Sequence, residues 1–227
     1  MYPNSSLNDR TGYGLWSPDT QSIGALLAKT YSLLALTLAV SAGASYYGMQ
    51  VPVFAEHPLL LMIGAFTLLF TIRFAGARHS LLAIPLVFLF AACMGLVMGP
   101  AVTHYFSMPD GPTIITESIA ATATMFIGIS AYAMICQHDF THFYGFTFTG
   151  LILAIFATIA NLLFLHLPAL QLAIAGVLVL VFSGLILLDT QRMIQSGMRE
   201  PAMLVVSLYL DIINLFMALL EIFGGSR

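Results

Sequence analysis

Seven apolar runs, each about 20 residues long and joined by short connections, constrain this chain more than any other feature. A hydrocarbon core of about 30 Å is crossed by about 20 residues of α-helix, because each residue rises about 1.5 Å. The runs lie at residues 23–47, 58–75, 80–99, 113–135, 143–165, 169–195 and 202–224. They predict an all-α integral membrane protein with seven transmembrane helices. Glycine and proline mark the joints at Pro52, Pro58, Gly99-Pro100, Gly111-Pro112, Pro168 and Gly197.

Charged residues make up only 7% of the 227 residues, and hydrophobic residues make up 59%. About a quarter of a typical soluble domain is charged, so the composition excludes an ordinary soluble fold. We expect one membrane domain at residues 23–227, surrounded by membrane lipids, and a polar, disordered tail at residues 1–22. The formal net charge of −3 gives no basis for a nucleic-acid partner.

Basic residues gather at one end of the predicted helices. Six of the seven lie on the side that holds the N-terminus, namely Arg10, Lys29, Arg73, Arg78, Arg192 and Arg199. The opposite side has only Arg227. Because loops rich in Lys and Arg stay in the cytoplasm, the pattern predicts a cytoplasmic N-terminus and a C-terminus outside.

The connection between the last two apolar runs places two carboxylates at similar depth. Gly197 is typical of a helix C-terminus and Pro201 of a first helical residue, so the hairpin folds between them. Asp189 and Asp211 then lie about 12 to 15 Å from the turn on adjacent antiparallel helices. Their side chains are predicted to face each other.

A polar stripe follows one face of the last run. It is formed by Ser207, Asp211, Asn214, Ala218 and Glu221, which recur at helical spacing. A helix with a single polar face directs that face inward. A charged side chain near the bilayer centre costs about 3 kcal/mol or more without a partner or water, so the stripe is a candidate functional site. Glu221 and Glu117 lie toward the outer face, where they either attract cations or are simply exposed at the interface.

Two sequences in the last runs resemble the transmembrane Bax-inhibitor-motif family. They are Leu-Leu-Asp-Thr-Gln at 187–191 and Val-Ser-Leu-Tyr-Leu-Asp-Ile-Ile-Asn-Leu-Phe at 206–216. The segments at 27–39 and 165–175 are similar more specifically to its bacterial YccA branch, while the two aspartates follow the YetJ-like arrangement. The resemblance runs from about residue 23 to the end.

The resemblance implies a seven-helix fold whose last helix is wrapped by the other six. For YetJ-like members it implies an aspartate pair that acts as the pH sensor of a calcium leak. For YccA-like members it implies association with FtsH, a membrane protease that grips a cytoplasmic N-terminal tail.

The chemistry of the aspartate pair suits a switch. Two carboxylates within hydrogen-bond reach in a poorly solvated site share one proton and titrate as a unit. With one proton, Asp189 and Asp211 hold the last two helices together; with none, they repel each other or take up a cation or an arginine. Ca²⁺ prefers about six to eight oxygens, and two carboxylates supply at most about four. Ser207 and Asn214, with water and backbone carbonyls, are candidates for the rest.

Two arginines are candidate counter-ions for the pair. Arg73 lies at a suitable depth near the inner end of the second run, and the resemblance also favours a gating arginine there. Arg192, one turn beyond Asp189, is the rival. The structural alternatives are a hydrogen-bonded aspartate pair that only fixes helix packing and an Arg73 that only sets topology.

Other reactive side chains give weaker signals. His138 and His142 lie four residues apart beside a carboxylate, which supplies only two or three ligands for a metal. Cys93 and Cys136 are single thiols in apolar runs and are expected to pack as small hydrophobes. An intramembrane aspartyl protease would need Gly-x-Gly-Asp, whereas Ile-Leu-Leu precedes Asp189. We expect neither enzymatic activity nor a bound cofactor.

Three functions remain from the sequence. The leading hypothesis is a pH-sensitive cation leak of a bacterial inner membrane, for Ca²⁺, gated by Asp189 and Asp211 with Arg73 as counter-ion. The first alternative is a modulator or substrate of FtsH, for which the tail matters rather than the pair. The second alternative is a proton-coupled transporter, although no discontinuous helix pair marks a transporter site.

Overall fold

The computed structural model describes residues 20–51, 58–76, 80–136, 140, 142–195 and 201–225. Over these residues the secondary structure is entirely helical. The helices are α1 (Thr20–Gln50), α3 (Pro58–Gly76), α4 (Ser80–Phe106), α5 (Gly111–Ile135), α6 (Phe143–Ala160), the π-helical turn η1 (Asn161–Leu165), α7 (Pro168–Gln195) and α8 (Pro201–Gly225).

Six of the described helices are long and apolar enough to cross a membrane. They are α1, α4, α5, α6 with its π-turn, α7 and α8, and α3 adds a shorter apolar stretch at Leu60–Phe74. Because helices satisfy all their backbone hydrogen bonds internally, they suit a solvent without water. The predicted all-α, multi-pass membrane class is confirmed.

Most predicted helix boundaries agree with the structure, and one does not. Pro168 and Pro201 begin helices, and α5 begins at Gly111. The prediction that Gly99-Pro100 ends the third run was wrong, because α4 continues through Pro100 to Phe106. Transmembrane helices tolerate proline where neighbouring helices and side chains satisfy the freed backbone groups. Of the predicted tail at residues 1–22, residues 1–19 lie outside the described residues, and residues 20–22 belong to α1, which begins at Thr20. The predicted cap at Gly197 also lies outside the described residues.

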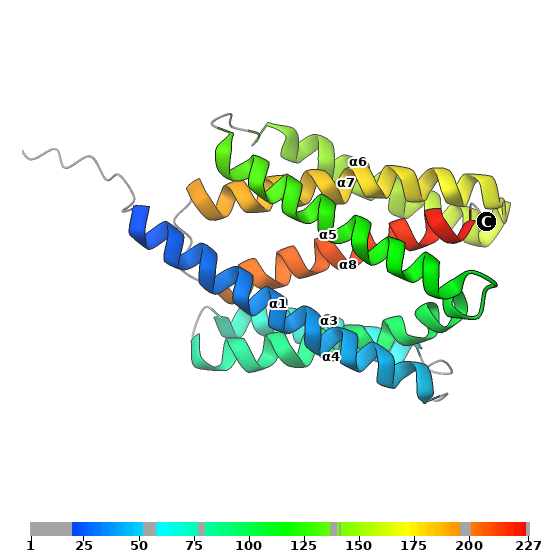
Figure 1. Ribbon diagram of the computed structural model, residues 1–227, viewed down its shortest axis with the longest axis horizontal. Helices are drawn as coiled ribbons and strands as arrows, with labels where there is room; N and C mark the ends of the chain where they lie inside the picture. Colours follow the sequence, from blue (N-terminus) through cyan, green and yellow to red (C-terminus); the bar gives the residue numbers. More distant parts are fainter. Residues whose placement is uncertain are drawn as a thin grey trace, which may run out of the picture.

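The helices form two bundles with α8 between them: the first bundle is α1, α3 and α4, and the second bundle is α5, α6 and α7 (Figure 1). In the first bundle α4 packs against α1 and α3, and in the second bundle α7 packs against α5 and α6. Helix α8 contacts α1, α3 and α4 on one side and α5 and α7 on the other. In its most apolar window 67% of the residues are buried, against 11 to 39% in the other spans. The last helix is therefore the most enclosed of the described spans.

Small residues bring α1 and α4 into close contact. A Cβ on Gly99 would lie 2.7 Å from the carbonyl carbon of Gly48, and one on Gly95 would overlap the carbonyl oxygen of Ser41. No side chain larger than hydrogen fits at these crossings. Since lipid tails are as apolar as leucine, helices in a bilayer associate through such close packing rather than through hydrophobic burial.

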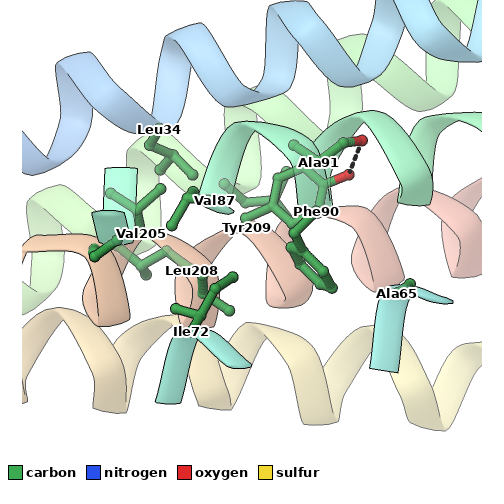
Figure 2. Packing of buried hydrophobic residues seen from close by; sticks show 13 residues of the cluster. Leu34, Ala65, Ile72, Val87, Phe90, Ala91, Val205, Leu208 and Tyr209 are labelled. Carbon is green, nitrogen blue, oxygen red and sulfur yellow. Dashed lines mark hydrogen bonds between the residues drawn. The ribbon is translucent and has the colours of Figure 1, made fainter. Parts of the chain in front are cut away.

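One face of α8 packs into a cluster of buried side chains from the first bundle (Figure 2). Tyr209 is 1% exposed, and its ring meets Phe90 edge-on with 5.8 Å between centroids. Its hydroxyl donates to the Ala91 carbonyl at 3.4 Å and forms a second hydrogen bond with Ser41 Oγ at 2.7 Å. The cluster also contains Leu34, Ala65, Ile72, Val87, Val205 and Leu208. This face of α8, which we call the dry face, packs against side chains of the first bundle, and its Tyr209 hydroxyl has two hydrogen-bond partners.

Candidate functional site

The opposite face of α8 borders a cavity of about 830 Å³ between α4, α6, α7 and α8. All five residues of the predicted polar stripe line it: Ser207, Asp211, Asn214, Ala218 and Glu221. Their common placement follows from helical geometry, since residues three and four apart share one face. The cavity thus extends along α8 over about 20 Å, from the level of Ser207 to the level of Glu221.

The two aspartates meet near the inner end of this stripe. Asp189 on α7 accepts a hydrogen bond at Oδ2 from the Ser207 hydroxyl on α8. Asp211 is 6% exposed, and its Oδ2 has no hydrogen-bond partner among the described residues. The two carboxylates are close enough for their charges to interact. A serine-aspartate hydrogen bond therefore joins α7 and α8 at this level, and Asp211 keeps an oxygen without a partner among the described residues.

Arg192, and not Arg73, lies beside the pair. Arg192 Nη1 is 3.7 Å from Asp189 Oδ1, one turn along the same helix. The Arg192 guanidinium also stacks over the ring of Tyr144 on α6, 4.1 Å from its centroid. Arg73 is exposed on α3 and makes no ion pair within the described part of the chain. Arg192 is three residues from Asp189 on the same helix, so the two side chains are neighbours on one helical face. Arg73 would have to reach the pair from another helix.

The two glutamates predicted at the outer face differ in position. Glu221 lines the cavity at the end far from Asp211. Glu117 is an exposed residue of α5 and is absent from the lining of that cavity. The structure therefore brings Glu221 into the stripe and leaves Glu117 outside it. Asn214, between the two ends, donates from Nδ2 to the Leu210 carbonyl of its own helix at 2.7 Å.

The weaker sequence candidates lie apart from the pair. Cys93 and Cys136 form no disulfide within the described residues and are half-buried, and Cys93 packs at the edge of the hydrophobic cluster as expected. His142 is exposed, while His138 lies outside the described residues. Within the described ranges no group of three or more His, Cys, Asp or Glu side chains is placed to hold a metal ion. A Ca²⁺ ion at the pair would need other oxygens, from water or carbonyl groups, for the ligands that the two carboxylates do not supply.

Sequence reasoning missed the residues that surround the stripe. Gln171 on α7 and His104 and Tyr105 on α4 line the cavity near Glu221. Asn161 on the π-turn is 4% exposed and hydrogen-bonds to Gln171. The only signal in the sequence was that Asn161 and Gln171 are amides inside apolar runs. Helical periodicity cannot relate residues that lie on different helices. Their proximity depends on the tertiary fold.

The fold and this site define a multi-pass membrane protein with a carboxylate-lined cavity beside its most enclosed helix. Residues 24–227 match the family described as "Inhibitor of apoptosis-promoting Bax1". Because this match spans nearly the whole chain, the protein belongs to the Bax inhibitor family. The family predicted from the motifs around Asp189 and Asp211 is confirmed.

Relatives in bacteria and in an animal agree with this membership. "Modulator of FtsH protease YccA" of Escherichia coli K12 is 32% identical over 221 residues, 97% of this chain and 95% of that protein. A relative in Escherichia coli O6:H1 with the same identity and coverage is named "Inner membrane protein YccA". "Protein lifeguard 4" of Mus musculus is 30% identical over 230 residues, 97% of this chain and 94% of that protein. The similarity to the YccA branch is thus confirmed over nearly the full length.

Proposed function

We propose that this protein is a pH-sensitive cation leak for Ca²⁺, gated by Asp189 and Asp211. One observation carries the proposal: Asp211 lines the cavity, is 6% exposed, and has an oxygen without a hydrogen-bond partner among the described residues. A buried carboxylate oxygen without a partner costs free energy unless a proton, a cation or water satisfies it. A cavity beside such an oxygen gives protons and cations a route to it.

The gate works through one change of charge. With a proton on the pair, α7 and α8 stay together through Ser207 and Asp189. When the proton leaves, two negative charges face each other, and they separate the helices or attract a cation. Arg192, 3.7 Å from Asp189, balances only one of the two charges. Flux should therefore rise with pH, because deprotonation both loosens the contact between helices and creates the cation site.

Calcium fits this route as a passing ion rather than as a resident one. Ca²⁺ takes about six to eight oxygens at flexible geometry. Asp189, Asp211, Ser207 and Asn214 offer side-chain oxygens along about 10 Å of α8, and water in the cavity supplies the rest. Such incomplete coordination favours release, which conduction requires. The mechanism needs neither a catalytic step nor a bound cofactor.

The orientation follows from charge. We propose that all seven helices cross the bacterial inner membrane, the other six around α8, with the N-terminus in the cytoplasm and the C-terminus outside. The basic residues Lys29, Arg73 and Arg192 at the N-terminal side support this orientation. The name of the O6:H1 relative supports the location. In this orientation Glu221 lies near the outer face and the aspartate pair in the cytoplasmic half.

A second function is favoured by the relative of E. coli K12, whose name describes a modulator of the FtsH protease. In this role the protein engages FtsH through its N-terminal tail, whose residues 1–19 lie outside the described part of the chain. A protease engages a tail independently of the aspartate pair. The two functions can therefore coexist in one protein.

The test is calcium-dye flux into proteoliposomes that contain the purified protein, over a rough pH window of 5.5 to 8 for a coupled carboxylate pair. Wild type is compared with Asp189→Asn and Asp211→Asn. Glu117→Gln is the matched control, because it also removes a carboxylate from a membrane helix but lies outside the cavity. We expect flux to rise with pH in wild type and in the control, and to lose its pH dependence in both aspartate variants.

Each outcome selects a function. Flux equal to that of empty liposomes in all variants would remove the leak and favour the protease role. Deletion of residues 2–19, which end just before α1, should abolish engagement of FtsH in a pull-down and spare flux. Accumulation of the ion against its gradient would instead indicate the proton-coupled transporter.

A further inference from the structure

Glu221 lies where two cavities meet. The cavity of about 830 Å³ contains the aspartate end of the stripe, and a second cavity of about 310 Å³ borders Pro168, Gly224 and Gly225. Both cavities are lined by His104, Tyr105, Gln171 and Glu221. An ion that passes from the second cavity toward Asp211 therefore passes this group. Glu221 is the only carboxylate among these four side chains.

A chain of hydrogen bonds fixes the orientation of Gln171. The backbone N–H of Leu167 donates to Asn161 Oδ1 at 3.0 Å, which identifies the oxygen end of this amide and leaves Nδ2 as its donor. This Nδ2 donates to the Leu167 carbonyl at 3.2 Å and to Gln171 Oε1 at 2.9 Å. Because Gln171 uses its oxygen for Asn161, its Nε2 remains as the donor toward Glu221, with which it interacts. The backbone thus determines which end of the amide meets the carboxylate.

The π-helical turn makes this chain possible. At η1 the helix widens, and His166 then takes a left-handed conformation with φ of 51°. The His166 N–H donates to the Asn161 carbonyl at 2.7 Å, which closes the turn and leaves the Asn161 side chain buried at 4% exposure. Single π-turns within helices often occur at functional sites. Here the turn presents an amide to the outer end of the cavity.

We propose that Glu221 is an outer site for a divalent cation and that Gln171 and Asn161 are its positioning residues. A carboxylate has about four lone-pair sites, so one amide bond holds it in place and leaves oxygen lone pairs for a cation. Asp211, which lines the same cavity and keeps an unpaired buried oxygen within the described structure, is the next carboxylate along α8, about 15 Å away. A cation moves from Glu221 to Asp211 along one face of one helix. The inference rests on the proposed leak for its role in permeation, but binding at Glu221 is independent of flux.

The test measures binding directly on the full chain in detergent. A hydrophobic carbodiimide labels membrane carboxylates, and mass spectrometry follows Glu221 while CaCl₂ is titrated. We expect Ca²⁺ to protect Glu221 in wild type. In Gln171→Met, of similar size but without the amide, half-protection should need about tenfold more Ca²⁺, the loss expected for a hydrogen bond to a charged group.

Gln171→Glu separates positioning from a merely structural role. This variant keeps an oxygen for Asn161 Nδ2 and adds a second carboxylate, so protection should need less Ca²⁺ than in wild type. Weaker protection in both Gln171 variants would indicate a structural role and overturn the assignment. Absence of labelling or of protection at Glu221 in wild type would overturn the site itself.

The cation site at Glu221 and the proposed leak can be refuted independently of each other. Protection of Glu221 without any proteoliposome flux would remove the leak and keep the cation site. Flux that titrates with pH, together with an unprotected Glu221, would keep the leak and remove the site. Glu117→Gln is again the control and should leave protection at Glu221 unchanged.

Discussion

The two faces of α8 carry polar groups that are satisfied in different ways. On the dry face Tyr209 is 1% exposed, and its hydroxyl has partners in Ser41 and Ala91. On the cavity face Asp211 is 6% exposed, and its Oδ2 has no hydrogen-bond partner among the described residues. Burial alone therefore does not distinguish a packing residue from a functional one. Tyr209 and Asp211 differ in that the described residues complete the hydrogen bonds of Tyr209 and leave Asp211 Oδ2 without a partner beside a cavity.

The largest expected effect is a difference in stability between variants on the two faces of α8. Tyr209→Ala removes a fully buried ring from the cluster of the first bundle and should lower the free energy of unfolding by about 3 kcal/mol or more. Asp211→Asn should not destabilise the protein, because it replaces a group that has an unpaired oxygen. Thermal unfolding in detergent measures both. An unfolding temperature of Asp211→Asn as low as that of Tyr209→Ala would contradict the difference between the two faces.

The next effect tests the close approach of helices on the dry side. Gly95→Ala places a Cβ against the Ser41 carbonyl and should cost about 1 to 3 kcal/mol, the range for overpacking. Gly64→Ala on α3 is the matched control, since a Cβ there meets nothing within 4 Å. The two variants are compared by the same unfolding measurement. Equal stability would mean that α1 and α4 do not depend on glycine at this crossing.

A smaller effect is expected at the counter-ion. Arg192→Gln removes the positive charge 3.7 Å from Asp189, so half-maximal flux should move to higher pH. The shift should stay below about one pH unit, because the Arg192 side chain is 40% exposed and such pairs contribute less than about 1 kcal/mol. Arg73→Gln, which removes an exposed arginine of α3, is the control. A larger shift in Arg73→Gln would restore Arg73 as the gating arginine.

The smallest effect concerns the hydroxyl on the dry face. Tyr209→Phe keeps the ring and loses only the hydrogen bonds to Ser41 and Ala91, which should cost about 0.6 kcal/mol for each bond, the average in a membrane protein. The pH dependence of flux should be unchanged. If Tyr209→Phe shifts that dependence, the two faces of α8 are coupled and the contrast between them is too simple.

The spans and the stripe could be predicted from the sequence because both depend on local geometry. Apolar length indicates a membrane helix, and spacing of three and four residues places Ser207, Asp211 and Glu221 on one face. The hairpin that brings α7 to α8 followed from Pro201, which begins a helix as expected. These inferences need only one or two neighbouring helices.

The remaining features depend on contacts between distant parts of the chain. Pro100 does not end α4, although a proline removes one backbone donor. The choice of Arg192 over Arg73 depends on side-chain reach and on Tyr144 of α6, which the sequence does not place. The bond from Asn161 to Gln171 requires a π-turn, and no residue pattern in the apolar run indicated one. Local periodicity therefore finds the polar face of α8 but not the side chains that surround it.

The position of α8 has a consequence for biogenesis. Helix α8 follows the six other described helices in the chain, yet it contacts helices of both bundles. Membrane insertion proceeds with synthesis, from the N-terminal side onward. An intermediate that ends before Pro201 therefore holds two bundles that meet mainly through α4 and α5 and lack the helix between them. Completion of the fold is a late step, and it coincides with the entry of Asp211 into the bilayer.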